Sequence, residues 1–529
     1  QDASLNGTGA TAILTKVPME LMPDRIGPGQ VSRFPQRTAL LENNPNFSQD
    51  PLGFGDFNIA FLYERKLIPT RKHNSPWQNG GDVYDLTTDL KWSGFGPPGQ
   101  ATSRVEAFLE SLMVLMRNKV LLNGGHLAGT QLVWFYPLSM SLFQRGFIEG
   151  LWRKVFDDTF HGAAPPLSMP ESIAPFYFFQ AGSTTQQVTA YSHPAVLVDI
   201  GGGTSDITVF AQNKPVAISS VRFAANAIFG DGFSTNGAST NGFVNRYEKA
   251  VKDHLANNGL SDLLNAYEEI KKQERSDDIV AFYFSLKTHY DLVRQGKTYD
   301  FEATLTHDRS IRIVFLVFYA ALMYHVAKLM KAKGLGMPRY LTFSGNGSKT
   351  LNILSHNDSA LAQLAKAMFE NVYDEPYHAD GLDLVRERNI PKEVTCKGGL
   401  LAASTQNPLQ LAQLVDGTRA VLLGTGDARM ATKADTYASV DDAVLTDVTN
   451  EVRNFVETLF SLDFPFQNFL GVDEGQFPAY KARLMRDLRD RLAEGWEQRR
   501  RPVTNPNAPL EETLFFLPLI AGLNDLAKP

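Results

Sequence analysis

The chain has 529 residues, of which 43% are hydrophobic and 20% are charged, and its formal net charge is −6. This length exceeds what one hydrophobic core organises, so we expect two to four domains or subdomains of an ordinary soluble globular protein. The negative net charge argues against general nucleic-acid binding. Cys396 is the only cysteine, which excludes an intrachain disulfide and favours a reducing, cytoplasmic compartment.

The longest apolar run and the first residues of the chain bear on membrane insertion and processing. The longest apolar run, Ile313–Tyr324, is too short for a bilayer and is typical of a buried helix, so we expect no transmembrane segment. The chain begins at Gln1 without a signal-like apolar stretch. We therefore expect a fragment or a processed product of a longer protein.

In chain order, residues 1–80 are rich in Pro, Gly and Asn and are expected to form loops and irregular strands, with extended runs at Arg37–Leu41 and Asn58–Tyr63. Apolar spacing then predicts helices and strands. The predicted elements are helix Arg104–Leu121, strand Gln131–Tyr136, helix Phe143–Phe156, the strand pair within Val196–Phe210, helices Phe243–Leu255, Leu260–Arg275 and Val314–Lys333, strand Tyr340–Phe343, strand Arg419–Gly424, and helices Asp441–Leu462 and Tyr480–Arg501. A final apolar segment, Glu511–Leu526, is predicted to be helical, with Pro518 kinking or interrupting it.

The most informative stretch is Val196–Phe210, which reads VLVDIGGGTSDITVF. A buried strand leads into Asp199, the glycines Gly201, Gly202 and Gly203 follow, and Thr204 opens the next strand. Glycine has no Cβ and tolerates positive φ, so this backbone is suited to close approach. Its consecutive N–H groups are suited to holding phosphate oxygens. A carboxylate beside phosphate is best explained if Asp199 holds a metal-bound water or a nucleophilic water; the alternative is a glycine-rich hairpin with a capping aspartate.

A second glycine turn follows the predicted strand Tyr340–Phe343. It reads Ser344-Gly345-Asn346-Gly347-Ser348-Lys349 and leads into a predicted helix. A strand, a glycine turn and a helix N-terminus together are typical of phosphate or nucleotide binding, because the helix start supplies free N–H donors.

The order and spacing of these two turns resemble the second phosphate loop and the adenosine loop of the actin-like ATPase superfamily. Within it the DnaK-type ATPase domain is the most similar, over about 380 residues. Four stretches of this chain resemble segments of that domain: Arg33–Leu41, Leu132–Gln144, Phe229–Phe233 (FGDGF) and Val394–Ser404 with its Gly398-Gly399 pair. Thr88-Asp89-Leu90-Lys91 resembles the segment with the catalytic lysine, and Glu171-Ser172-Ile173-Ala174 resembles Glu-Pro-Thr-Ala.

This resemblance implies an α/β, two-lobed actin-like fold of ribonuclease H-like subdomains, in which sheets are flanked by helices. The expected domains are a first lobe over 1–195, a second lobe over 196–405, and a mainly helical C-terminal extension over 406–529. ATP or ADP with Mg²⁺ would lie between the lobes. The resemblance makes Asp199 the catalytic and metal-associated carboxylate, Glu171 the residue that orients water, and Lys91 the residue that stabilises phosphoryl charge.

The nucleotide-binding residues that the resemblance implies are Gly201, Gly202, Gly203, Thr204, Gly230, Asp231, Glu269, Lys272, Ser276, Gly345, Asn346, Gly347, Ser348 and Lys349. Two of the catalytic assignments have ordinary alternatives. Lys91 could be a surface lysine, and Glu171 could be a carboxylate at a helix N-terminus.

One expected element of the superfamily is not found. A first phosphate hairpin of the type Asp-x-Gly-Thr-Thr should precede Arg33–Leu41, but Gly7–Thr11 has no preceding strand or aspartate, and Phe54–Phe57 comes too late. Either the hairpin lies upstream of Gln1 or the protein has lost it. The non-methionine start favours the first, in which case the parent protein is an ATP hydrolase.

The sequence thus predicts an ATP-binding, DnaK-like ATPase fragment whose nucleotide state controls a protein partner or client. The alternative is a nucleotide-independent scaffold or filament-forming pseudo-ATPase, and a small-molecule kinase is a third class without an identifiable base. The resemblance ends near Thr405, and the arginine-rich helix Tyr480–Arg501 is expected to be a solvated face with i,i+4 ion pairs rather than a site for an acidic partner.

Overall fold

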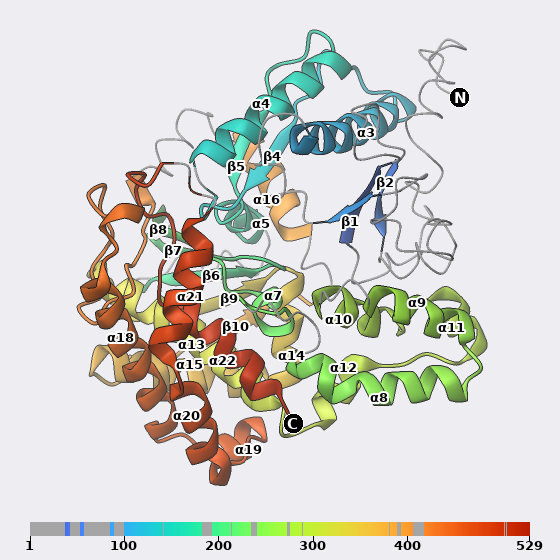
Figure 1. The fold of residues 1–529 in the computed structure, drawn as a ribbon. Coiled ribbons are helices and arrows are strands. Elements are labelled where there is room, and N and C mark those ends of the chain that lie inside the picture. Colours follow the sequence, from blue (N-terminus) through green and yellow to red (C-terminus); the bar gives the residue numbers. More distant parts are fainter. Residues whose placement is uncertain are drawn as a thin grey trace. The chain divides into compact units, whose positions relative to one another are not determined.

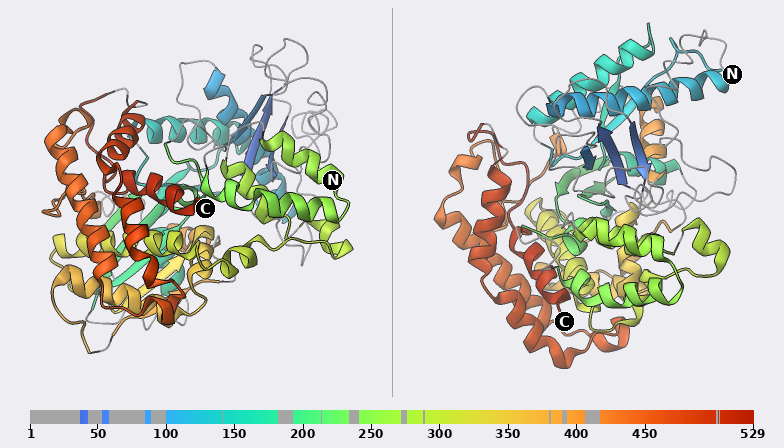
Figure 2. Two further views of the ribbon diagram at one scale, coloured as in Figure 1. Left: turned by 60° about the horizontal axis from the view of Figure 1, so that its bottom comes forward. Right: turned by 45° about the vertical axis from the view of Figure 1, so that its right-hand side comes forward.

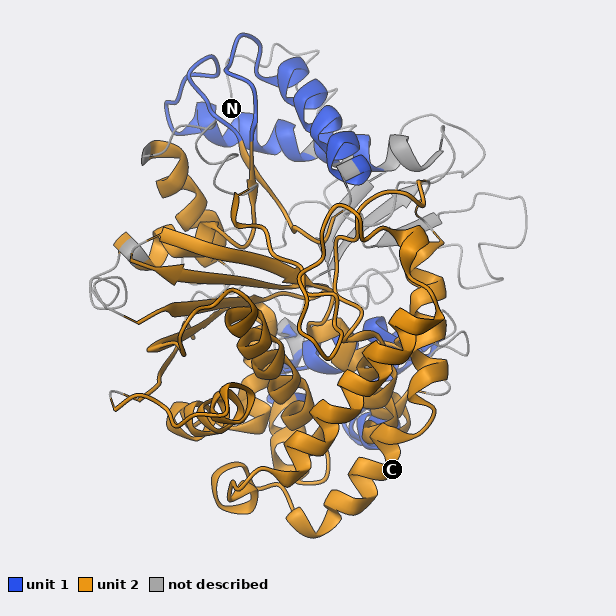
Figure 3. Cartoon of the chain, turned by 90° about the vertical axis from the view of Figure 1, so that its left-hand side faces the viewer, with its two compact units in different colours: residues 1–132, 142–167, 247–301 blue, residues 133–141, 168–246, 302–529 orange. Residues whose placement is uncertain are grey.

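The computed structural model describes residues 37–42, 53–57, 85–88, 100–140, 142–181, 193–212, 214–233, 241–271, 276–287, 289–379, 381–388, 393–405, 417–501, 503 and 505–529. The chain divides into two compact units (Figure 3). The first comprises residues 1–132, 142–167 and 247–301, and the second comprises residues 133–141, 168–246 and 302–529. Chain segments far apart in sequence therefore build each unit. The domain boundaries expected at residues 195 and 405 stay predictions.

The first unit contains a small sheet and two groups of helices. Strand β1 (Arg37–Glu42) lies between β2 (Gly53–Phe57) and β3 (Asp85–Thr88), and both pairings are antiparallel. The helices are α3 (Gln100–Leu122), α4 (Leu142–Thr159), most of α8 (Gly242–Asn257), α9 (Ser261–Lys271), α10 (Ser276–Ser285), α11 (Tyr290–Gln295) and the start of α12 (Phe301–His307). Helices α3 and α4 share an apolar core that includes Val105, Leu109 and Phe156, as their helical spacing predicted.

The second unit is organised around a five-stranded mixed sheet in the order β10-β9-β6-β7-β8 (Figure 1). Its strands are β6 (Ala195–Ile200), β7 (Ser205–Ala211), β8 (Lys214–Val221), β9 (Tyr340–Ser344) and β10 (Asp383–Arg386). The central strand β6 runs parallel to β9 and antiparallel to β7. Every residue of β6 is buried, which shows that both faces of the sheet are covered.

Alternation along the strands assigns each face of this sheet to different helices. On one face, Phe176 of α5 (Ala174–Ala181) packs with Ala195 and Leu197. On the other, Tyr319 of α13 (Arg312–Ala332) contacts Phe343, the β9 partner of Val198. Because side chains of a strand point to opposite faces in turn, Asp199 lies on the α5 face, with Ala195 and Leu197.

The remaining elements of the second unit are β4 (Val133–Tyr136), β5 (Leu167–Pro170, from its second residue), α7 (Ala225–Phe229), the 3₁₀ helix η4 (Asn346–Thr350), α14 (Leu351–Leu354), α15 (Asp358–Tyr373), α16 (Glu393–Thr405), η5 (Tyr437–Ser439), α18 (Asp442–Ser461), α19 (Phe466–Leu470), η6 (Glu474–Gln476), α20 (Phe477–Met485), α21 (Leu488–Arg500) and α22 (Leu517–Ala527). The α/β class with sheets flanked by helices is confirmed, and the segment after residue 417 is mainly helical, as expected.

The C-terminal segment packs directly on the sheet and helices of the second unit (Figure 2). Ala420 N donates to Ile218 O at 2.8 Å, so the segment covers part of the outer edge of β8, the last strand of the sheet. Phe516 stacks on Phe223, and Asn524 Oδ1 accepts a hydrogen bond from Gly242 N at 2.7 Å. These contacts make it part of the second unit's core.

Four expectations from the sequence need correction. Arg419–Gly424 forms isolated bridges rather than a strand. Pro518 stands in the first turn of α22, where its missing N–H costs nothing, so it begins the helix instead of interrupting it. The apolar run expected to be too short for a bilayer belongs to the 21-residue α13, which is long and apolar enough to cross one. Its expected burial is confirmed, because 94% of the relevant window lies inside the structure.

The arginine-rich helix is also different from the expectation. It is two helices, α20 and α21, separated at Asp487, which has a left-handed φ of 53°. The ion pair of Arg501 with Glu497 has the expected i,i+4 spacing. On the other face, Arg491 is buried and pairs with Asp525 of α22. The helix is therefore a packing element with only one solvated face.

Candidate nucleotide site

Asp199 lies at the carboxyl end of the central strand β6 and is only 9% exposed. Its neighbours across the sheet are Asp206 on β7 and Ser344 on β9. The hydroxyl of Thr395, near the start of α16, donates to Asp199 Oδ2 at 2.6 Å. A buried carboxylate is thus held in one orientation by a hydroxyl that lies 196 residues away in the chain.

The glycine hairpin follows directly and connects β6 to β7. Gly201 N donates to Thr204 O at 2.8 Å, and the carbonyl oxygens of Gly201 and Gly202 accept from Ala225 N and Asn226 N, at 3.3 and 2.7 Å. The start of α7 therefore fixes the peptide planes of the hairpin. The hydroxyl of Thr204 is turned to Asp206 Oδ2, at 3.1 Å.

The N–H groups of Gly202 and Gly203 are not bonded to α7 as the carbonyls of Gly201 and Gly202 are. Both residues are exposed, and neither N–H makes a hydrogen bond within the part of the chain that the structure describes. None of Gly201–Gly203 has a positive φ, so left-handed backbone does not explain the glycines. Their value is an uncovered pair of donors, of the kind that holds phosphate oxygens.

The second glycine turn lies against the first. A Cβ at Gly345 would fall 2.2 Å from Asp199 Oδ1 and 2.3 Å from Ile200 O, and one at Gly347 would fall 2.2 Å from Gly201 O. Only glycine permits this approach, and Gly345 also has a φ of 78°. Two motifs about 140 residues apart, as the sequence indicated, are thus in direct contact at Asp199.

The rest of the second turn is a 3₁₀ helix, η4, rather than the immediate start of the expected α-helix. Its buried Ser348 donates through Oγ to Gly345 O at 2.6 Å, which closes the turn. Asn346 is half-buried and Lys349 is exposed. Ser348 therefore acts within the turn, and Lys349 lies at its surface.

Gly230 and Asp231 lie at the other end of α7 from the glycine hairpin. Asn241 Nδ2 donates to Gly230 O at 3.0 Å and to Asp231 Oδ1 at 3.4 Å. A Cβ at Gly230 would fall 2.6 Å from Asn226 O. Because Asn226 also donates to Gly202 O, α7 connects this loop to the glycine hairpin.

Glu171 directly follows β5, where its N–H donates to Tyr136 O at 2.9 Å, and its side chain is half-buried. Helix α16 contacts both α5, which follows Glu171, and the side chain of Asp199. A Cβ at Gly398 would fall 1.9 Å from Ala174 O, the first residue of α5, and one at Gly399 would fall 2.2 Å from the Phe135 ring. The two glycines let α16 cross α5 closely, and Thr395 of the same helix bonds Asp199.

The other predicted residues belong to the first unit. Ser276 is buried at the start of α10 and Glu269 lies on α9. Lys91 and Lys272 lie outside the described residues. Their proposed contacts with nucleotide stay predictions.

A magnesium ion fits the donor set only in one way. No group of three or more His, Cys, Asp or Glu side chains among the described residues could hold a metal ion by itself. Mg²⁺ is usually held by one or two carboxylates, with waters and substrate phosphates completing its shell. Asp199 beside exposed N–H donors suits that arrangement and does not suit an all-protein metal cage.

Thr395 is the residue that sequence reasoning missed. The segment Val394–Ser404 had attracted notice for Gly398-Gly399, and Thr395 lies three residues earlier. No local signal distinguishes a threonine that bonds a carboxylate from one that faces solvent. Its role depends on the crossing of α16 over α5.

No model of a protein family and no curated protein sequence matches this chain. Among solved structures, the chain is similar to MreB5 of Spiroplasma citri bound to ADP, with 10% identity and a TM-score of 0.28, over 69% of this chain and 88% of that one. It is also similar to human actin-related protein Arp8 in its ATP-bound state, with 10% identity and a TM-score of 0.31, over 73% and 77%. A MamK mutant bound to AMPPNP matches with 12% identity and a TM-score of 0.30, over 69% and 90%.

Proposed function

We propose that this chain is an actin-like nucleotide-binding protein that holds the phosphates of ATP or ADP at the Gly201–Thr204 hairpin. The contact of Gly345 with Asp199 is the observation that carries this proposal. It joins two glycine turns and a buried carboxylate at one point, and it leaves the N–H groups of Gly202 and Gly203 open to an anion. Asp199 would hold Mg²⁺ through water, and Thr395 would keep the carboxylate oriented.

The finer roles belong to the same proposal. Glu171 would orient water, Lys91 would stabilise phosphoryl charge, and Gly230, Asp231, Glu269, Lys272 and Ser276 would contact the rest of the nucleotide. A nucleotide that binds one arrangement of the two units better than another would increase the population of that arrangement. A protein partner that distinguishes the arrangements would then respond to the nucleotide. A cytoplasmic location and the DnaK-type relationship are supported only by the sequence features that suggested them.

Binding is the activity proposed for this chain. Hydrolysis requires, by the same resemblance, a first phosphate hairpin, and we find none in the sequence. A chain that binds nucleotide without hydrolysing it would act as a nucleotide-dependent scaffold.

Calorimetry of Mg-ATP and ADP binding tests the proposal. We expect the unaltered chain to bind both nucleotides and Gly202→Arg to lose the hairpin site, seen as one fewer nucleotide bound per chain, because the new side chain covers the free N–H groups. Gly336→Arg is the matched control, since Gly336 is exposed and no atom of the described residues lies within 4 Å of its added Cβ. Failure of the folded, unaltered chain to bind either nucleotide would leave the nucleotide-independent scaffold as the better description; nucleotide-dependent sedimentation would identify filament formation.

A further inference from the structure

A polar cavity of the second unit is lined by residues that belong to neither glycine turn. Its volume is about 410 Å³, and it lies where α12 ends, α13 begins, α14 leads into α15, and α19 ends. Its lining contains the side chains of Arg309, Arg312 and His356 and four amides, and it contains no Asp or Glu. A cavity of this size is in the range of small-molecule sites.

Among the described residues, no carboxylate pairs with the charge of Arg312. Its Nη1 donates to Leu470 O at 3.0 Å and its Nη2 donates to Thr306 O at 2.8 Å, so the guanidinium caps the carbonyl ends of two helices. Its Nε is buried without a hydrogen-bond partner among the described residues. Burial and the nearby charge of Arg309 lower the pKa of Arg312, as expected for a cation held in positive surroundings.

Arg309 is exposed at the cavity, and its side chain makes no hydrogen bond or ion pair with the described residues. The carboxylates on neighbouring elements have partners, and Glu474 Oε1 accepts from the N–H of the lining residue Gln467 at 3.0 Å. Asp308 pairs with Arg246 at 3.1 Å, and Asp358 pairs with Arg386 and Arg388. The positive charge at the cavity is therefore available to a ligand.

Two helix starts add to this positive potential. The cavity is lined by the first residue of α13, which has no side-chain cap, and by Asn357, the N-cap of α15. The N-terminal turns of helices attract anions. The amides of Asn352, Gln467 and Asn468 supply donors around them.

We propose that this cavity binds a small molecule carrying adjacent phosphoryl groups, with Arg309 as its principal charged contact. Guanidinium groups bind phosphate oxygens in a forked geometry, and no oxygen of the described residues occupies the guanidinium of Arg309. The proposal does not depend on nucleotide binding at the Gly201–Thr204 hairpin.

Pyrophosphate and ADP are the probes, titrated by calorimetry into Gly202→Arg, in which the glycine hairpin is blocked. We expect both to bind, more weakly as salt rises, because adjacent phosphoryl groups are what they share. Adding Arg309→Gln should reduce pyrophosphate affinity roughly tenfold or more, the usual effect of losing a charge-assisted hydrogen bond. Arg453→Gln removes the same charge from an exposed site on α18 and should leave binding unchanged.

Three results would overturn the proposal. One is the absence of pyrophosphate binding by folded Gly202→Arg, and another is binding that Arg309→Gln does not weaken. The third is binding of a hexaglutamate peptide without binding of pyrophosphate, which would make the cavity a site for an acidic protein segment. Arg309→Gln in the unaltered chain should preserve Mg-ATP binding at the hairpin, which separates the two sites.

Discussion

Gly345 and Asp199 are so close that a Cβ on the first would lie 2.2 Å from a carboxylate oxygen of the second. Gly345→Ala should therefore displace Asp199 and strain a backbone whose φ is 78°. We expect loss of nucleotide binding in calorimetry together with a lower melting temperature. Gly336→Ala, at an open position of the same unit, should change neither. Full nucleotide affinity in Gly345→Ala would show that the position of Asp199 does not matter for binding.

Changing Thr395 tests whether nucleotide binding requires Asp199 to be held in one orientation. Thr395→Val removes the 2.6 Å hydrogen bond while keeping the shape of the side chain. Because a hydrogen bond to a charged group is worth about 1.5–3 kcal/mol, we expect a roughly tenfold or larger loss of Mg-ATP affinity. Thr395→Ser should retain most of the affinity. Equal losses in the two variants would contradict an orienting role for the hydroxyl.

The close crossing of α16 over α5 depends on Gly398. A Cβ there would meet Ala174 O at 1.9 Å, so Gly398→Ala should destabilise the protein by about 1–3 kcal/mol in urea unfolding. Gly150→Ala in α4 is the matched control, since no atom in the described part of the chain lies within 4 Å of its added Cβ. That control should stabilise the protein by about 0.5–1 kcal/mol, because alanine loses less backbone entropy in a helix.

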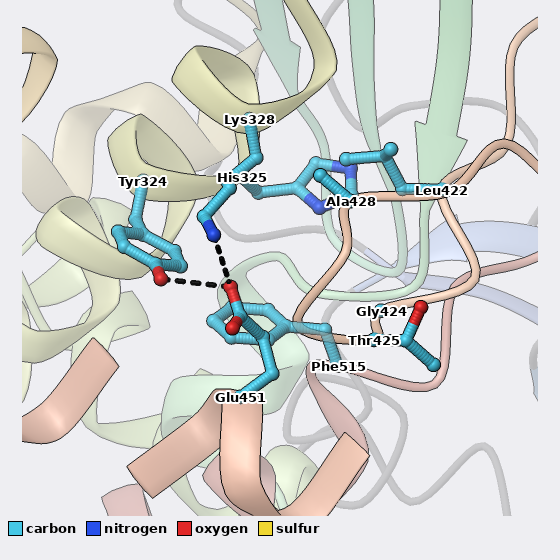
Figure 4. Close-up of a pocket in the computed structure, with 9 residues that line it drawn as sticks. All are labelled: Tyr324, His325, Lys328, Leu422, Gly424, Thr425, Ala428, Glu451 and Phe515. Atoms are coloured by element: carbon cyan, nitrogen blue, oxygen red, sulfur yellow. Dashed lines mark hydrogen bonds and ion pairs between the residues drawn. The ribbon is translucent and has the colours of Figure 1, made fainter. Parts of the chain in front are cut away.

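His325 makes stability depend on pH. It lines a cavity of about 10 Å³ between α13, α18 and the loops around Leu422 and Phe515 (Figure 4). Burial lowers the pKa of His325 from 6.5 to about 3, so between these values the unfolded chain binds the additional proton. This contribution to stability is present above pH 6.5 and is lost as the pH falls towards 3, at no more than about 1.4 kcal/mol per pH unit.

His325→Leu should abolish this contribution. Urea unfolding at several pH values between 7 and 4 measures it as the difference in slope between the unaltered chain and the variant, which removes the effect of all other titrating groups. Identical slopes would mean that His325 titrates with the same pKa in the folded and the unfolded chain.

The carboxylate of Glu451 closes the same cavity. It accepts hydrogen bonds from Tyr324 Oη at 2.7 Å and pairs with Lys328 Nζ at 2.8 Å, and its side chain is only 4% exposed (Figure 4). Glu451→Leu leaves Lys328 without its counter-ion, so we expect a loss of about 3–5 kcal/mol. Adding Lys328→Met should recover part of this loss in a double-mutant cycle. Additive effects of the two changes would contradict an energetic coupling between the two side chains.

Local sequence patterns predicted the helices α3, α4, α8, α13 and α18 and the strands around Asp199 because their apolar spacing is set by the geometry of one element. They failed where long-range packing decides the outcome. The predicted helix Tyr480–Arg501 is divided at Asp487, and its Arg491 pairs with Asp525 of α22. Likewise Pro518 begins α22, where a helix interior had been expected.

By itself the sequence determined the α/β class, the two glycine turns and Asp199 as the residue between them, because glycine runs and buried strands leave local signals. The tertiary structure decided what those residues contact. Thr395 reaches Asp199 and Gly347 meets Gly201, each through elements that are distant in sequence. Arg309 and Arg312 line a cavity whose described residues include no carboxylate, which sequence spacing does not specify. Such contacts arise from helix crossings and sheet register, and these are properties of the whole fold that no local pattern encodes.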